Sequence, residues 1–214
     1  MIIKPLKYRL AIVHKLLFHP FVHPDFPDSL KKRNYSMQPL PEIPPGPRAY
    51  VSGHLAMKDG CLIETNNEKK LLAVEGINEK FVQIMKDLIS ISQDDFNINF
   101  ESDLDFMEFT GNFIVITDKS PIDAFSKFRP DIFDKFSKVL GSESTLFGIH
   151  LVPNNLLPSS RNWFDIQIQP RLTKSDKEYY VSTVYRSEDM GKVMEFSENI
   201  GKKVTSIITL IEED

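Results

Sequence analysis

Three carboxylates with the spacing of metal ligands occur in the middle of the chain. Glu101, Asp103 and Asp105 are two residues apart, and alternate side chains of a β-strand point the same way. Oxygen ligands of this kind bind hard cations such as Mg²⁺ or Ca²⁺. Leu104 and Phe106 supply an apolar opposite face, so a solvated strand face is the simpler interpretation. We keep the three acids as candidate metal ligands.

A single cysteine, Cys61, is the candidate nucleophile. A thiol beside a base can attack a substrate, and His54 and His150 are the bases considered. A lone cysteine is more often a small buried apolar residue. The sequence contains no Gly-x-Ser-x-Gly elbow, phosphate-binding loop, dinucleotide fingerprint or Cys-x-x-Cys pair. It therefore shows no catalytic signature and predicts no cofactor.

Aromatic and cationic side chains gather in two segments near the C-terminus. They are Arg161, Trp163, Tyr179, Tyr180, Tyr185 and Arg186. These residue types are enriched in binding hot spots, and arginine binds anions. Aromatic residues also favour strands for structural reasons alone. We predict a site for a partner or an anionic ligand at these six residues.

The composition indicates a protein of a reducing compartment such as the cytoplasm. One cysteine excludes an intramolecular disulfide. The net charge of −4 gives no overall attraction to phosphate, so nucleic acid is not an expected partner. No segment reaches the roughly 18 to 20 uninterrupted apolar residues of a membrane-spanning helix.

A basic segment begins the chain. Residues 4–18 contain no acid, and Leu6, Leu10, Val13 and Leu17 recur at helical intervals. This pattern predicts an amphipathic helix. Such a helix would dock on the body of the protein, lie on an anionic membrane surface, or act as an organelle-targeting segment.

A proline-rich arm follows this segment. Eight prolines lie between Pro20 and Pro47, which excludes a helix or a central strand there. A further alternative is that the chain starts at Met37, in which case residues 1–36 do not belong to the mature protein. We expect folded structure to begin near Tyr50.

The rest of the chain alternates strands with helices. Strands are expected at residues 50–57, 61–64, 71–75, 96–101, 113–117, 147–151, 164–169 and 178–186, with helices after Asn78, Ser120, Asp131 and Ser187. The predicted fold class is α+β: antiparallel sheets built from successive strand-strand-helix units, with helices on one face, in a ferredoxin-like or helix-grip arrangement. Three such units are divergent copies or share one sheet. We divide the chain into residues 1–48, 49–142 and 143–214, the last two packed as one body.

The last helix carries the strongest periodic pattern. Its apolar residues are Val193, Phe196, Ile200, Val204, Ile207 and Ile211. Their average period of about 3.6 residues predicts a helix lying across a sheet and not a coiled coil. Gly201 would then mark a close approach to that sheet.

These patterns support three hypotheses of function. The leading one is a non-catalytic binding or regulatory module that self-associates, as a homodimer, with a small-molecule or protein ligand. The alternative is an enzyme that uses the carboxylates around Asp103, or Cys61, in a pocket lined by phenylalanines. The third is a peripheral membrane protein that binds through residues 4–18.

Overall fold

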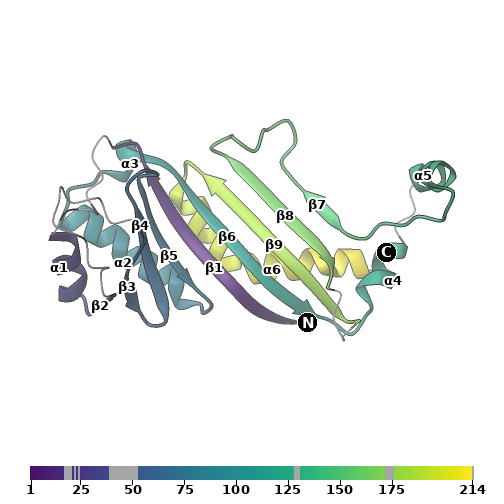
Figure 1. Ribbon diagram of the computed structural model, residues 1–214, viewed down its shortest axis with the longest axis horizontal. Helices are drawn as coiled ribbons and strands as arrows, with labels where there is room; N and C mark the ends of the chain where they lie inside the picture. The colour runs from purple at the N-terminus through teal and green to yellow at the C-terminus, as the bar shows by residue number, and fades with distance from the viewer. Residues whose placement is uncertain are drawn as a thin grey trace, which may run out of the picture.

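The protein is an α+β structure with one antiparallel sheet. The computed structural model describes residues 1–16, 21, 23, 25–38, 53–127, 131–171 and 176–213. In this part of the chain nine strands form a single sheet with the order β2-β3-β4-β5-β1-β6-β9-β8-β7 (Figure 1). The strands are β1 (Ile2–His14), β2 (Ser36–Met37), β3 (Gly53–Lys58), β4 (Cys61–Asn66), β5 (Leu71–Gly76), β6 (Leu104–Ile116), β7 (Ile149–Leu151), β8 (Trp163–Pro170) and β9 (Glu178–Ser187). The helices are α1 (Asp25–Lys32), α2 (Lys80–Asp94), α3 (Phe100–Asp103), α4 (Pro121–Ser126), α5 (Ile132–Leu140) and α6 (Met190–Glu213).

Two halves of the chain have a similar topology, although the first has one strand more than the second. Each half begins with a long central strand, β1 or β6, which pairs with the other at the middle of the sheet. The following strands are added from the edge inward, so that β5 and β9 return beside the central pair. Each half ends with a long helix, α2 or α6. The described strands therefore form two similar halves, of five strands (β1–β5) and four strands (β6–β9), and the expected series of three strand-strand-helix units is not confirmed.

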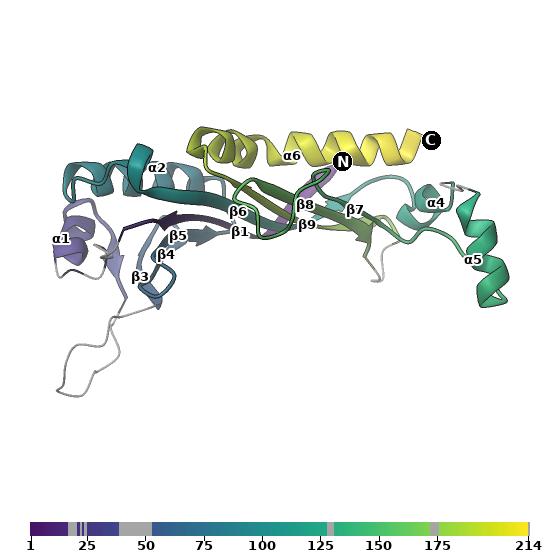
Figure 2. The same cartoon turned by 90° about the horizontal axis from the view of Figure 1, so that it is seen from above.

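Both long helices lie on one side of the sheet (Figure 2). Helix α2 contacts β1, β4 and β5, and α6 contacts β6 and β9. No described helix lies across the opposite side, which we call the open face (Figure 2). The main core lies between the sheet and the two helices, where Leu10, Ile12, Phe109 and Val204 are completely buried.

The expected helix over residues 4–18 is wrong. Residues 2–14 form β1, which pairs with β5 on one side and β6 on the other. Tyr8, Leu10 and Ile12 alternate toward the core, and this period of two fits the run as well as the helical period does. A chain that began at Met37 would lack this central strand. Residues 17–18 of the predicted helix and the proline-rich run at residues 39–47 lie outside the described residues. The expectation that the prolines between Pro20 and Pro47 exclude a helix is wrong, because α1 forms there with Pro27 in its first turn, where no backbone donor is needed. Folded structure therefore begins with β1 and not near Tyr50.

The last helix crosses the sheet as expected. Ile200 and Val204 are buried against it. A Cβ atom added at Gly201 would lie 3.1 Å from Ile3 Cδ1, which accounts for the glycine at this close approach. Ile207 is only partly buried, and its neighbour Ile208 is fully buried in its place.

Local turn and cap signals are confirmed at several places. Asp59 and Gly60 have positive φ angles of 52° and 78° in the β3–β4 hairpin. The Ser120 side chain accepts a hydrogen bond from the Asp123 amide at the start of α4. Gly141 ends α5 in the left-handed conformation. The expected strand at residues 96–101 is wrong, because its last residues begin α3.

Candidate functional site

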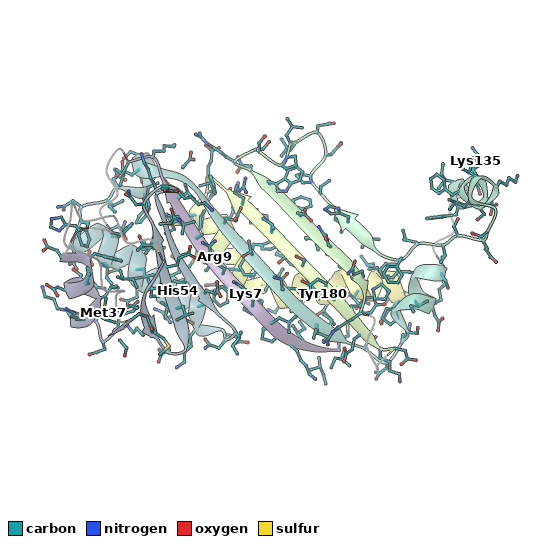
Figure 3. The ribbon with its side chains drawn as sticks, in the orientation of Figure 1. Lys7, Arg9, Met37, His54, Lys135 and Tyr180 are labelled. Atoms are coloured by element: carbon teal, nitrogen blue, oxygen red, sulfur yellow. The ribbon has the colours of Figure 1, made fainter. Side chains whose placement is uncertain are left out.

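A depression lies on the open face over the central strands, toward the ends of β1 and β9 at His14 and Ser187. Its volume is about 410 Å³. It is lined by Arg9, Ala11, Val13, Glu64, Lys69, Leu71, Phe106, Glu108 and Arg186. Figure 3 looks onto this face, where Lys7, Arg9 and Tyr180 are labelled on β1 and β9. Five strands from both halves, β1, β4, β5, β6 and β9, therefore supply one site.

The register of the strands explains why there is a depression here. Ala11 is paired with Ala73 on β5 and with Glu108 on β6. Ala11, Leu71 and Ala73 form a small apolar cluster of their own, with Val13 packed against it. Alanine side chains are short, so longer side chains on the flanking strands stand above them. The result is an apolar floor inside a charged rim.

An ion pair forms one side of the rim. Arg9 on β1 donates through Nη2 and Nε to Glu64 Oε2 on β4, at 2.9 and 3.2 Å. The two side chains thus reach across β5, over the short Ala73. Their side chains are only 19% and 25% exposed.

A second ion pair forms the opposite side. Arg186 Nε on β9 donates to Glu108 Oε2 on β6 at 2.8 Å. The guanidinium lies over the Phe106 ring at 4.7 Å, and its Nη1 donates to the carbonyls of Pro158 and Ser160. Arg186 is therefore fixed from three directions, with its side chain 21% exposed.

The electrostatics of the rim suit a ligand with one negative charge. The two partly buried ion pairs, Arg9–Glu64 and Arg186–Glu108, contribute little to the net stability of the fold, because desolvation of both charges offsets their attraction. Lys69 lines the same depression and makes no ion pair with any described residue. Three cations and two carboxylates on the rim leave an excess of one positive charge. An apolar body could rest on the floor while its anion contacts Lys69.

The six predicted binding residues do not form one site. Arg186 lines the depression, and Trp163 is paired with it on β8. Arg161 lies nearby but forms an ion pair with Asp105 at 2.7 Å. Tyr180 is on the open face, where its hydroxyl hydrogen-bonds with Asn112.

The other two tyrosines point to the covered face. Tyr179 is completely buried, and burial, followed by the adjacent Glu212 carboxylate, raises its pKa. Tyr185 stacks on Phe196 of α6 with ring centroids 4.2 Å apart. Strand alternation separates these side chains from Tyr180 and Arg186. Tyr179 is therefore a core residue, and Tyr185 is a partly buried residue packed against the core.

The predicted metal ligands do not converge either. Glu101 and Asp103 lie in α3, so the expected alternation along a strand is wrong for them. Asp103 Oδ2 accepts the Asn99 amide at 2.9 Å, and Asp105 is paired with Arg161. Within the described residues no group of three or more His, Cys, Asp or Glu side chains is placed to bind a metal ion.

Cys61 is on the covered face, buried in the first half. Its thiol donates to Asn78 Oδ1 at 3.6 Å. Burial, and then the Asp59 carboxylate, raise the pKa of the thiol, which is opposite to what a reactive cysteine requires. His54 is paired with Glu64, whose side chain reaches Arg9 on the open face. His150 is bound to Asp165 at the edge.

Asp87 on α2 is the centre of a polar cluster. It accepts hydrogen bonds from Tyr35, Lys58 and Arg33 at 2.8, 2.9 and 3.0 Å. Burial opposes its ionisation, but hydrogen bonds from Lys58, Tyr35 and Arg33 outweigh it and hold the pKa of the carboxyl below its ordinary value. Partners from the chain itself occupy this carboxylate, so the cluster attaches the region around α1 to α2.

A groove between α2 and α6 is the alternative ligand site. Its volume is about 750 Å³, and Ile3, Pro5 and Tyr8 contribute to its lining. Lys86 on α2 and Glu198 on α6 form an ion pair of 2.8 Å between the two helices. Two helices that lie side by side on a sheet leave a groove between them, so the groove does not by itself indicate a ligand. The groove is larger than the depression but has no enclosed charges.

Sequence reasoning found Arg186 and missed the rest of the rim. Arg9 and Glu64 lie 55 residues apart in the sequence, and nothing local indicates their pairing. The alternation of Lys7, Arg9, Ala11 and Val13 was a usable signal, because it marks a strand with a mixed open face.

Comparisons with known proteins do not assign the chain to a family. No protein-family model, curated protein or solved structure matches it. In the described part of the chain, no helix has both the length and the apolar character needed to cross a membrane.

Proposed function

We propose that the protein is a non-catalytic binding or regulatory module that self-associates, and that its ligand site is the depression on the open face. The ligand class is a small organic anion with an apolar body. The observation that supports this is that two partly buried ion pairs, Arg9–Glu64 and Arg186–Glu108, lie on either side of the apolar floor of the depression. Pockets of this size with a few fixed polar groups are typical small-molecule sites.

The other hypotheses have less support from the geometry. The enzyme alternative needs a thiol or carboxylates that converge on one cavity, and Cys61, Asp103 and Arg186 lie in three separate places. The membrane alternative needs an amphipathic helix where β1 lies. A reducing compartment, the absence of a nucleic-acid partner and a ferredoxin-like or helix-grip arrangement remain predictions.

A fluorescent apolar anion, anilinonaphthalene sulfonate, tests the site in the full chain. We expect saturable binding to the folded protein. Val13→Trp fills the depression and should abolish that binding while circular dichroism stays unchanged. Lys69→Gln should weaken it by up to about fivefold, the effect of losing one exposed ion pair.

Ile77→Asp is the matched control. Ile77 is 62% exposed and lines the groove between α2 and α6. The probe should bind this variant as tightly as the unchanged protein. If Ile77→Asp loses the probe and Val13→Trp keeps it, the groove is the ligand site and the proposal is wrong.

A further inference from the structure

Helix α5 stands away from the body of the protein (Figures 1 and 2). It has nine residues, and none of them is buried. The helix begins at Ile132 and is followed by the capping Gly141. An isolated helix of this length is marginal in water, so contacts with another surface are needed to stabilise it.

One side of α5 is apolar and exposed. Ile132, Phe136, Val139 and Leu140 are 46%, 47%, 85% and 66% exposed. The Phe133 ring packs edge-on against Phe136 at 6.0 Å and extends the same side. An exposed apolar stripe on a helix marks an interaction surface.

A polar flank of α5 is already occupied by the chain itself. Ser137 Oγ donates to the Phe133 carbonyl, as a side chain does within a helix. It also accepts the Ser144 amide at 3.0 Å, which holds the segment after Gly141 against this flank. Among the described residues, the apolar side chains Ile132, Phe136, Val139 and Leu140 stay 46–85% exposed.

The charges of α5 are arranged to complement a second copy of themselves. Asp131 and Asp134 lie at the N-terminal end, and Lys135 and Lys138 follow them. We infer that α5 is the contact through which two copies of the chain associate, as an antiparallel pair about a twofold axis. This inference rests on the self-association in the proposed function and not on the ligand site.

An antiparallel pair centred on Phe136 satisfies both the apolar and the charged positions. Ile132 of each copy lies at the level of Leu140 of the other, and Asp134 lies at the level of Lys138. The equal numbers of acids and lysines do not suit an anionic membrane surface, which favours a basic flank. The contact is isologous, as in most homodimers.

The size of the contact sets its strength. A helix of nine residues is about 13.5 Å long. Two such helices bury less than the roughly 1,200 Å² of a standard stable interface. The dimer is therefore weak and forms in a concentration-dependent way.

Sedimentation velocity of the full chain, over about three decades of concentration, tests the contact. The unchanged protein should shift from monomer to dimer as concentration rises. Phe136→Asp should be monomeric throughout, with the circular dichroism spectrum that the unchanged protein has at concentrations where it is a monomer. Leu210→Asp is the control, since Leu210 is 63% exposed on α6 and should leave the dimer intact.

A charge-exchange series tests the antiparallel register. Asp134→Lys and Lys138→Asp should each weaken the dimer, because each places like charges at one level. The double variant, Asp134→Lys with Lys138→Asp, should restore it. A double variant no tighter than the singles would overturn the antiparallel arrangement.

These experiments distinguish a wrong contact surface from a wrong prediction of self-association. A dimer that persists in Phe136→Asp means that α5 is not the contact, although self-association stands. A protein that is monomeric at every concentration overturns both, while binding of the fluorescent probe still decides the ligand site. If the monomer instead binds phosphatidylcholine vesicles and Phe136→Asp does not, α5 is a membrane contact and the inference is wrong.

Discussion

The short helices of the two halves, α1 and α5, contrast sharply in burial. Each follows the long first strand of its half and precedes the added strands. Phe26 and Leu30 of α1 are completely buried, whereas α5 buries nothing. A similar topology therefore does not imply an equivalent role: α1 completes the core of its half, and α5 presents its apolar side outward.

The surroundings of each helix explain the contrast. Phe26 packs against Phe21 and Phe96 with ring centroids 4.8 and 5.8 Å apart. In the second half this role is taken by α4, where Phe125 packs on Tyr179 at 6.0 Å. Since α4 already closes the end of the core beside α6, α5 has no place in it.

The largest effect is expected for a buried charge on α6. Ile200→Asp should unfold the protein, because Ile200 is 4% exposed and the carboxylate would have no partner. Urea denaturation followed by circular dichroism measures this. Ile207→Asp should cost less than Ile208→Asp, since Ile207 is only partly buried. A folded Ile200→Asp variant that merely dissociates a dimer would contradict the placement of α6 on the sheet.

Removing a phenylalanine side chain should have a smaller effect that differs between α1 and α5. Phe26→Ala should lower the free energy of unfolding by about 3–5 kcal/mol, because it leaves a cavity in the core. Phe136→Ala should change it by no more than about 0.5 kcal/mol at concentrations where the chain is monomeric. Equal losses in the two variants would show that α5 packs on the body and would remove the contrast.

The smallest effect concerns the attachment of α1 to α2 through Asp87. Asp87→Asn should cost about 1–3 kcal/mol at neutral pH, since three donors lose a charged acceptor. The folded protein lowers the pKa of Asp87, so this stability is present above the unfolded pKa of about 3.9 and is lost as pH falls through the lower folded value. Urea titrations of both proteins from neutral pH to below pH ~4 should therefore converge. A constant difference at all pH values would argue against an ionised Asp87 at this contact.

Local chemistry predicted much of the fold. The Asp59-Gly60 hairpin, the Ser120 cap and the Gly141 stop each depend on neighbouring residues alone, and each is present. The helix α1 within residues 20–47 was not expected, and two segments were assigned the wrong element, residues 4–18 and residues 96–101. In both, a short apolar run fits more than one period, and the pairing of distant strands or a local cap decides between them.

The candidate site was mostly beyond sequence reasoning. Arg186 was recognised from its residue type, but its ion pair with Glu108 joins β9 to β6 across 78 residues. Tyr179 and Tyr185 were selected for the same reason, but Tyr179 belongs to the core and Tyr185 packs against the core under α6. Residue type therefore identified candidates, and the register of the strands selected among them.

Local sequence patterns were enough to predict the α+β class, most strands and the long C-terminal helix, because periodic burial and turn residues act over a few positions. The folded structure was needed to show that β1 is a central strand, that Arg9 and Arg186 line one depression, and that the apolar side chains of α5 are exposed. Those features depend on which distant segments pair and which helix fills the available core. Contacts of that kind are set by the whole chain and leave no local pattern.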